Sequence, residues 1–250
     1  MTVTLAWRIT IAFVLMVMSG TSRLVAQQTP RASAPVDLTG TWVSIVNEDW
    51  RWRMVTPPPG DYAGIPLNPA GQKFAQAWDP AMNGSCQAFG AAALLRMPTR
   101  VRIAWESERT LKLETDNGQQ VRRLMFGSQA RPAHRTLQGQ SAAEWVRTLP
   151  PSNPFGLAFP GGPPPPPGGG LKVVTTHMSG GWLRRNGVPY SENAVVTEYF
   201  DRFPVPNGGE WFVVTTVVDD PIYLLRPFVT SSHFRRELDD SKWQPRPCRM

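Results

Sequence analysis

Three side chains in the second half of the chain have the chemistry of an acid–base site: His177, Glu198 and Tyr199. Histidine gains and loses a proton near neutral pH, and a carboxylate or a phenol beside it can share that proton. Because neighbouring residues of a strand face opposite ways, only one of Glu198 and Tyr199 can share a cavity with His177. This pattern predicts cofactor-free lyase, isomerase or hydrolase chemistry on a hydrophobic substrate, and a half-buried structural histidine is the alternative.

Other catalytic signatures are missing from the sequence. There is no Gly-X-Ser-X-Gly, phosphate loop, dinucleotide fingerprint or His-Glu-X-X-His. His134, His177 and His233 lie far apart and lack ligand spacing, although His177 and His233 could converge with Glu198 or Asp201 if all faced inward. We therefore expect no metal and no cofactor.

Two tryptophans, and hydroxyl residues such as Thr175 and Thr215 in the predicted strands, are candidates for the lining of a pocket. Trp50 and Trp52 are two residues apart, so they would share one face of a strand. Core packing, sugar stacking or oligomer contacts are the alternatives for the tryptophans, and cross-strand hydrogen bonding is the alternative for the hydroxyls. The predicted ligand-binding residues are Trp50, Trp52, Thr175, His177, Tyr199, Thr215 and His233.

Two series of alternating segments are expected to position these residues on an antiparallel sheet. Residues 99–126 predict three strands, with a tight Asp116-Asn117-Gly118 turn. The second series predicts four strands, at 171–178, 194–203, 210–218 and 222–237. Asn68-Pro69 predicts the start of a helix over 68–78, and residues 149–170 predict a Pro/Gly-rich loop insertion.

These elements predict a mainly β fold with one short helix. A sheet of about eight to ten strands usually curls or closes, which removes its exposed edges. We expect residues 37–250 to form a single domain, an up-and-down antiparallel barrel with room for one small ligand. A β-sandwich of the same strands is the alternative.

The first 26 residues have the pattern of a cleaved secretory signal peptide. Arg8 precedes a short apolar run over 11–18, and Leu24-Val25-Ala26 offers a cleavage point. The run is too short to span a bilayer comfortably, although an uncleaved anchor is the alternative. We expect a periplasmic or secreted protein with a disordered lead-in over 27–36 and no integral membrane span after cleavage.

Charge and cysteine content narrow the function further. The chain carries a net charge of +7, and its arginine pairs, such as Arg122-Arg123, are scattered rather than clustered. Nucleic-acid binding requires a basic patch, so we exclude it. Two cysteines, Cys86 and Cys248, predict one disulfide in an oxidising compartment. A catalytic thiolate at Cys86 is the alternative.

Two short motifs and a late arginine resemble those of the lipocalins and related calycin barrels. Gly40-Thr41-Trp42 resembles their Gly-X-Trp, and Thr197-Glu198-Tyr199 resembles a looser form of their Thr-Asp-Tyr, with Glu198 in place of Asp. The resemblance implies that Gly40 and Trp42 close one end of a barrel beneath a late arginine, Arg235 or Arg236. The wider chain is similar to a family of exported proteins from environmental bacteria, which implies a compartment but no activity.

Three functions follow as hypotheses. The first is an exported binding or carrier protein for a small hydrophobic, possibly anionic, molecule in the barrel cavity. The second is an enzyme that uses the same pocket. The third is an envelope interaction module, or a homo-oligomer, that uses the Pro-rich loop and the doubly apolar strand at 210–218. An enclosed cavity with converging polar groups favours the first two, and a filled interior with an exposed apolar patch favours the third.

Overall fold

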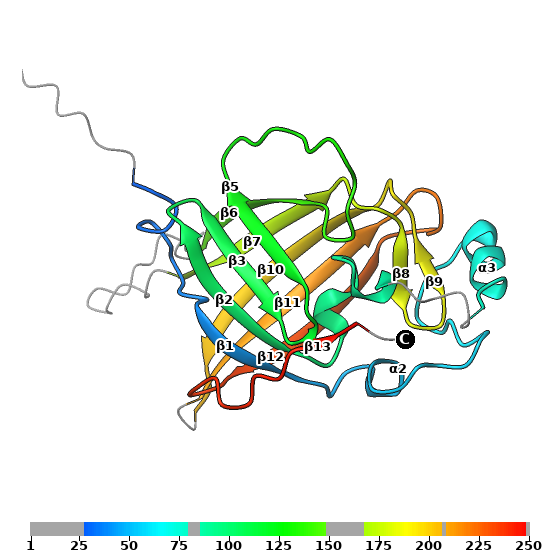
Figure 1. Cartoon of the computed structure of the whole chain (residues 1–250), viewed down its shortest axis with the longest axis horizontal. Coiled ribbons are helices and arrows are strands. Elements are labelled where there is room, and N and C mark those ends of the chain that lie inside the picture. The colour runs from blue at the N-terminus through cyan, green and yellow to red at the C-terminus, as the bar shows by residue number, and fades with distance from the viewer. Residues whose placement is uncertain (1–27, 80–85, 149–167, 207–208, 249–250) are drawn as a thin grey trace, which may run out of the picture.

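The structure is a computed structural model that describes residues 28–79, 86–148, 168–206 and 209–248. Nine strands form a closed barrel in the order β1-β12-β11-β10-β7-β6-β5-β3-β2 (Figure 1). Their bounds are β1 Gly40–Ile45, β2 Arg100–Ser107, β3 Thr110–Thr115, β5 Val121–Phe126, β6 Gln140–Thr148, β7 Gly168–Thr176, β10 Val195–Pro204, β11 Glu210–Asp219 and β12 Phe228–Arg236. Strand β1 pairs with both β2 and β12, so the ring is closed and the β-sandwich alternative is wrong.

The barrel is mixed rather than wholly antiparallel. Strand β6 pairs in parallel with β5, where Leu124 lies opposite Ser141, and every other pair of the ring is antiparallel. A parallel pair requires the chain to return to the same end before the second strand begins. Residues 127–139 make that return as the loop that arches away from the strands in Figure 1. The barrel strands follow one another around the ring in chain order, but the predicted antiparallel direction is wrong at this one pair.

Alternation of side chains places the core inside the barrel, as the sequence predicted. Leu111 and Leu113 are buried, whereas Lys112 and Glu114, which alternate with them, face outward. The four predicted strands of the second series are found as β7, β10, β11 and β12, although residues 222–227 of the last one form the turn before β12. Residues 168–170 of the predicted loop insertion begin β7, and the rest of that insertion and the predicted signal peptide lie outside the described residues.

One end of the barrel is closed by an aromatic layer around Trp42. The Trp42 ring lies edge-on to Phe212 at 4.9 Å, and its Nε1 donates to the Leu38 carbonyl at 3.0 Å. The Arg236 guanidinium lies 5.6 Å from the centre of the Trp42 ring. Gly40 has φ 123°, and a Cβ there would lie 3.3 Å from Arg236 Nε, so a side chain would be both strained and crowded.

Arg235 does not share this place. It pairs in register with Val43 and Trp211 on the outer face, because neighbours on a strand point to opposite sides. Of the two arginines considered, Arg236 therefore makes the contact with Trp42.

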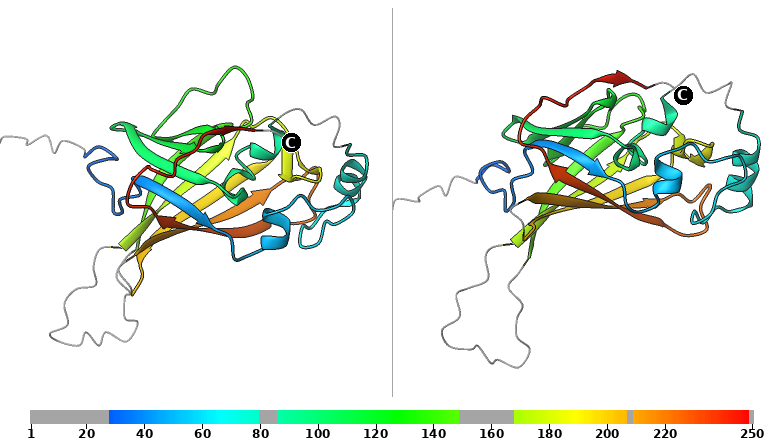
Figure 2. Two further views of the ribbon diagram at one scale, coloured as in Figure 1. Left: turned by 60° about the horizontal axis from the view of Figure 1, so that its bottom comes forward. Right: turned by 90° about the horizontal axis from the view of Figure 1, so that it is seen from below.

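The helices gather at the other end of the barrel (Figure 2). They are α2 Trp50–Arg53, α3 Pro69–Gln76 and the 3-10 turns η2 Gln87–Phe89 and η3 Leu94–Arg96. Helix α3 confirms the predicted helix, and the Asn68 side chain accepts a hydrogen bond from Gly71 N at 2.9 Å as its cap. Residues of η2 and η3 are buried in the barrel core, so this segment plugs the barrel.

The strand predicted around Trp50 and Trp52 is instead helix α2. Asp49 adopts a left-handed conformation with φ 51°, which turns the chain out of β1 and starts the helix. Trp50 is 63% exposed, whereas Trp52 is half-buried. The two tryptophans therefore do not share one face of a strand.

Two further pairings tie down the plugged end. Strands β8 Gly181–Arg184 and β9 Val188–Tyr190 form a hairpin across the Asn186-Gly187 turn. The C-terminal segment crosses the outside of β1 and β2, and its strand β13 Arg246–Pro247 pairs with β4 Asn117–Gly118. The predicted disulfide is confirmed, with Cys86 and Cys248 5.4 Å apart at their Cα atoms.

Candidate functional site

A buried ion pair crosses the barrel interior beneath the plug. Arg122 on β5 and Glu198 on β10 both have side chains that are 0% exposed. Arg122 Nη2 and Nη1 donate to the two carboxylate oxygens of Glu198 at 2.6 and 2.9 Å. This two-point contact is the strongest geometry that an arginine and a carboxylate can adopt. It joins strands that are not neighbours in the barrel.

Two hydroxyl groups complete this polar centre. Arg122 Nη2 also lies 3.1 Å from Thr175 Oγ1 and 3.4 Å from Ser141 Oγ, and these hydroxyls are 2.8 Å apart. Because removing two charges from water is costly, such a pair persists only where its hydrogen bonds are well satisfied. We call Arg122, Ser141, Thr175 and Glu198 the lumen cluster.

Tyr190, the last residue of β9, is a second buried polar residue at this end of the barrel. A Cβ added at Gly90 would lie 2.0 Å from the Tyr190 hydroxyl, and one added at Gly181 would lie 2.6 Å from it. The hydroxyl therefore packs against two glycines, where any larger residue would clash with it. Burial raises the pKa of Tyr190, opposed in part by the nearby charge of Arg122. Tyr190 Oη and Arg122 Nε are both buried and have no hydrogen-bond partner among the described residues. Burial therefore keeps the Tyr190 hydroxyl protonated.

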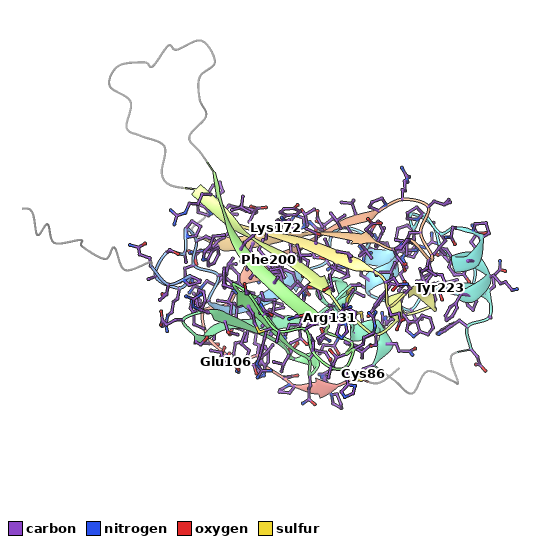
Figure 3. All side chains as sticks on the ribbon, turned by 90° about the horizontal axis from the view of Figure 1, so that it is seen from above. Cys86, Glu106, Arg131, Lys172, Phe200 and Tyr223 are labelled. Atoms are coloured by element: carbon purple, nitrogen blue, oxygen red, sulfur yellow. A yellow bond between two sulfur atoms is a disulfide. The ribbon has the colours of Figure 1, made fainter. Side chains whose placement is uncertain are left out.

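A pocket of about 450 Å³ opens on the outer side of Tyr190. We call it the mouth pocket; it is lined by Phe74, Gln87, Gly180, Gly181, Trp182, Pro189, Tyr190, Ser191, Glu192, Asn193, Ile222 and Tyr223. The centre of the Phe74 ring lies 5.7 Å from the centre of the Trp182 ring and 5.3 Å from the centre of the Tyr223 ring. Figure 3 shows Tyr223 beside α3 at this end of the barrel. The volume of the mouth pocket falls within the range of small-molecule sites, which are mainly apolar with a few polar groups.

The walls of the mouth pocket are fixed from both sides. Helix α3 packs closely on the β11–β12 connection, because a Cβ at Gly71 would lie 2.5 Å from the Tyr223 carbonyl. The buried Asp220 carboxylate accepts hydrogen bonds from Ser191 N, Ser191 Oγ and Ile222 N at 2.6, 2.7 and 2.9 Å. The β8–β9 hairpin and residues 222–223 are thus held in one arrangement, so the pocket is preformed.

The structure separates the three residues predicted for acid–base chemistry. Glu198 points into the barrel, whereas Tyr199 points outward and is 40% exposed. His177 follows the end of β7 with φ 58°, and its Nδ1 accepts from Arg131 Nε at 3.3 Å. Glu198 and Thr175 therefore meet in the lumen cluster, and His177 and Tyr199 lie elsewhere.

The other predicted lining residues lie on the outside of the barrel or in α2. Thr215 faces outward, with its hydroxyl 3.4 Å from Ser231 Oγ. His233 also faces outward, where its Nδ1 contacts the Glu48 carboxylate. Trp52 Nε1 donates to Asp61 at 3.1 Å. Residues 28–36, the described part of the lead-in, contact the barrel, where Trp145 Nε1 donates to the Pro30 carbonyl at 2.7 Å.

Several residues of the site were not predicted, although one left a readable pattern. In the run 121–126, Arg122, Leu124 and Phe126 occupy every second position and therefore share one face of the strand. Because Leu124 and Phe126 are apolar, this period of two places Arg122 among the inward-facing residues. Tyr190 and Trp182 lie in a hairpin of short strands that carries no clear alternation.

Comparison of the chain with protein-family models, with curated proteins and with solved structures finds no match in any of the three. Among the described residues, no helix is both long and apolar enough to cross a membrane. Within the same residues, no three His, Cys, Asp or Glu side chains are grouped so that they could hold a metal ion.

Proposed function

We propose that the protein binds a small, mainly apolar molecule in the mouth pocket. The observation that carries this proposal is the preformed pocket of about 450 Å³ with the rings of Phe74, Trp182 and Tyr223 in its wall. Aromatic walls favour flat, ring-containing ligands, because stacked or edge-on rings gain energy beyond the area they bury. Glu192 and Asn193 in the lining supply polar groups that would orient such a ligand.

The geometry favours binding over acid–base catalysis. Both carboxylate oxygens of Glu198 accept hydrogen bonds from Arg122, so Glu198 is engaged as a structural partner. Tyr190 lines the mouth pocket, and its hydroxyl lies against the backbones of Gly90 and Gly181. Burial raises the pKa of Tyr190, so its hydroxyl would stay protonated beside a ligand in the mouth pocket and would not act as a base there.

The site of action that we propose is the periplasm or the exterior of the cell. The Cys86–Cys248 disulfide supports this proposal, because such bonds persist mainly in oxidising compartments. A distant relationship to lipocalin-like barrels is likewise a proposal. Gly40, Trp42 and Arg236 support it by their packing, whereas the parallel β5–β6 pair distinguishes this barrel from a simple up-and-down one.

Binding of N-phenyl-1-naphthylamine, a neutral aromatic dye, tests the proposal by fluorescence titration. We expect Phe74→Ala and Tyr223→Ala each to weaken binding by about 2- to 10-fold, the worth of one aromatic contact. Phe203→Ala is the matched control, because Phe203 is 38% exposed, close to the 44% of Phe74, and lies outside the pocket lining. Absence of dye binding, or equal loss in all three variants, would contradict the proposal.

A further inference from the structure

A second, smaller cavity beside α2 is walled by arginines. We call it the arginine pocket; it is lined by Trp52, Arg53, Ala88, Ala93, Arg96, Met97, Leu183, Arg184 and Arg185. It shares no lining residue with the mouth pocket. The room at its centre is about 10 Å³, which suits one species of the size of a water molecule.

Several guanidinium nitrogens of this cavity lack a partner although they are buried. Arg53 and Arg184 are only 3% and 5% exposed. Arg53 Nε donates to the Arg96 carbonyl at 2.8 Å, and Arg184 Nη2 donates to the Ala63 carbonyl at 2.7 Å. Arg53 Nη2 and both Nε and Nη1 of Arg184 have no hydrogen-bond partner among the described residues. Buried charged donors left in this state are costly, so they call for an acceptor.

Positive charge exceeds negative charge around the cavity. Within the described chain, the ion pairs of its four arginines are Arg53 with Glu48 at 3.4 Å and Arg96 with Asp49 at 3.0 Å. Burial, and then the charge of Arg96, lower the pKa of both Arg53 and Arg184 to about 10. A negative charge inside the cavity would stabilise the charged form of both arginines and so oppose the lowering of their pKa by burial and by Arg96.

The donors of Arg184 are also held in a fixed orientation. Its guanidinium lies 4.6 Å from the centre of the Trp52 ring, a cation–π contact that orients the planar group. The Trp52 ring is itself tethered through its hydrogen bond to Asp61. The unpartnered nitrogens of Arg184 are therefore preorganised, as expected of a binding site rather than of a mobile surface arginine.

We infer that the arginine pocket binds one small inorganic anion of the size of chloride, held by Arg53 and Arg184. The size limit follows from the room in the cavity, and the charge follows from the unpartnered buried donors. This site is independent of the proposed ligand in the mouth pocket.

The test is thermal unfolding of the full chain in mixtures of sodium chloride and sodium gluconate at constant ionic strength. We expect the Tm to rise by about 3 °C once chloride exceeds its dissociation constant tenfold. Arg184→Met should abolish this chloride-dependent shift. Arg123→Met should retain it, because Arg123 forms an exposed ion pair with Glu106 on the outer face of the barrel.

Chloride-35 NMR of the unmodified chain provides the second readout and does not depend on any variant folding. We expect the protein to broaden the chloride resonance, and bromide, a competing halide, to reverse the broadening. A Tm that is equal in chloride and gluconate, together with an unbroadened resonance, would overturn the inference, since water would then fill the cavity. Stabilisation by phosphate but not by chloride would overturn it as well, because phosphate exceeds the available room.

Discussion

The ion pair of Arg122 and Glu198 allows a sharp prediction about stability. Replacing Arg122 with Met removes every donor that the structure shows for the Glu198 carboxylate, at 2.6 and 2.9 Å, and leaves that charge inside the barrel. Breaking a buried pair from one side costs about 3–5 kcal/mol. We place Arg122→Met near the upper end of that range, because Arg122 is the hydrogen-bond partner of both Glu198 oxygens among the described residues.

The reverse substitution should cost less. In Glu198→Met the Arg122 guanidinium keeps two acceptors, Thr175 Oγ1 at 3.1 Å and Ser141 Oγ at 3.4 Å. We therefore expect a loss of about 3 kcal/mol for Glu198→Met. The double variant Arg122→Met/Glu198→Met fills the same space with apolar atoms and removes both charges. Its stability should return to within about 1–2 kcal/mol of the unmodified chain, since apolar replacement of a whole buried pair is often neutral.

Urea unfolding, followed by tryptophan fluorescence with the disulfide intact, measures this cycle. The exposed pair of Arg123 and Glu106 is the control, with atoms 2.7 Å apart and 54% of the arginine side chain exposed. Arg123→Met should cost less than about 1 kcal/mol, because surface pairs contribute little. A cost below about 1 kcal/mol for Arg122→Met, equal to that control, would refute the reasoning and would show that water reaches the lumen cluster.

Three further predictions concern other parts of the fold. Replacing Cys86 and Cys248 together with Ser should lower the free energy of unfolding by roughly 2–5 kcal/mol, as measured by urea midpoint. Gly40→Ala should cost about 1–3 kcal/mol by the same assay, because its φ of 123° suits only glycine. Burial raises the pKa of Tyr190 above that of an unfolded tyrosine, about 10, so its contribution to stability is present below pH 10 and is lost as the pH rises above it. Tyr190→Phe should flatten this alkaline loss in thermal unfolding between about pH 9 and 11.5, whereas Tyr199→Phe should leave it unchanged.

Local patterns predicted most of the barrel, because alternation reports directly on which side of a sheet is buried. Leu111 and Leu113 show the pattern clearly, and their strand was found. Strand β6 was missed because its inward positions include the small residues Ser141 and Ala143, which weaken the apolar alternation. Its parallel pairing with β5 depends on the path of the loop before it, which no period in the sequence reveals.

The site was predictable only in part, since its contacts join distant segments. Alternation correctly implied that one of Glu198 and Tyr199 would face inward, but it left open which one. The partner of Glu198 is Arg122, 76 residues earlier in the chain, and nothing local links the two. The strand predicted at Trp50 and Trp52 was wrong because a spacing of two residues fits a strand, whereas the left-handed conformation of Asp49 begins a helix there.

The closure of the ring between β1 and β12 has a consequence for how the chain reaches its native state. Trp42 pairs with Arg236, so the final seam joins the first barrel strand to the last. Contacts this remote in sequence slow folding, because a long loop must be ordered before they form. A chain threaded through a translocation pore could complete this seam only after β12 had emerged. Until then, the edges of β1 and β11 would stay open to chaperones or to mispairing.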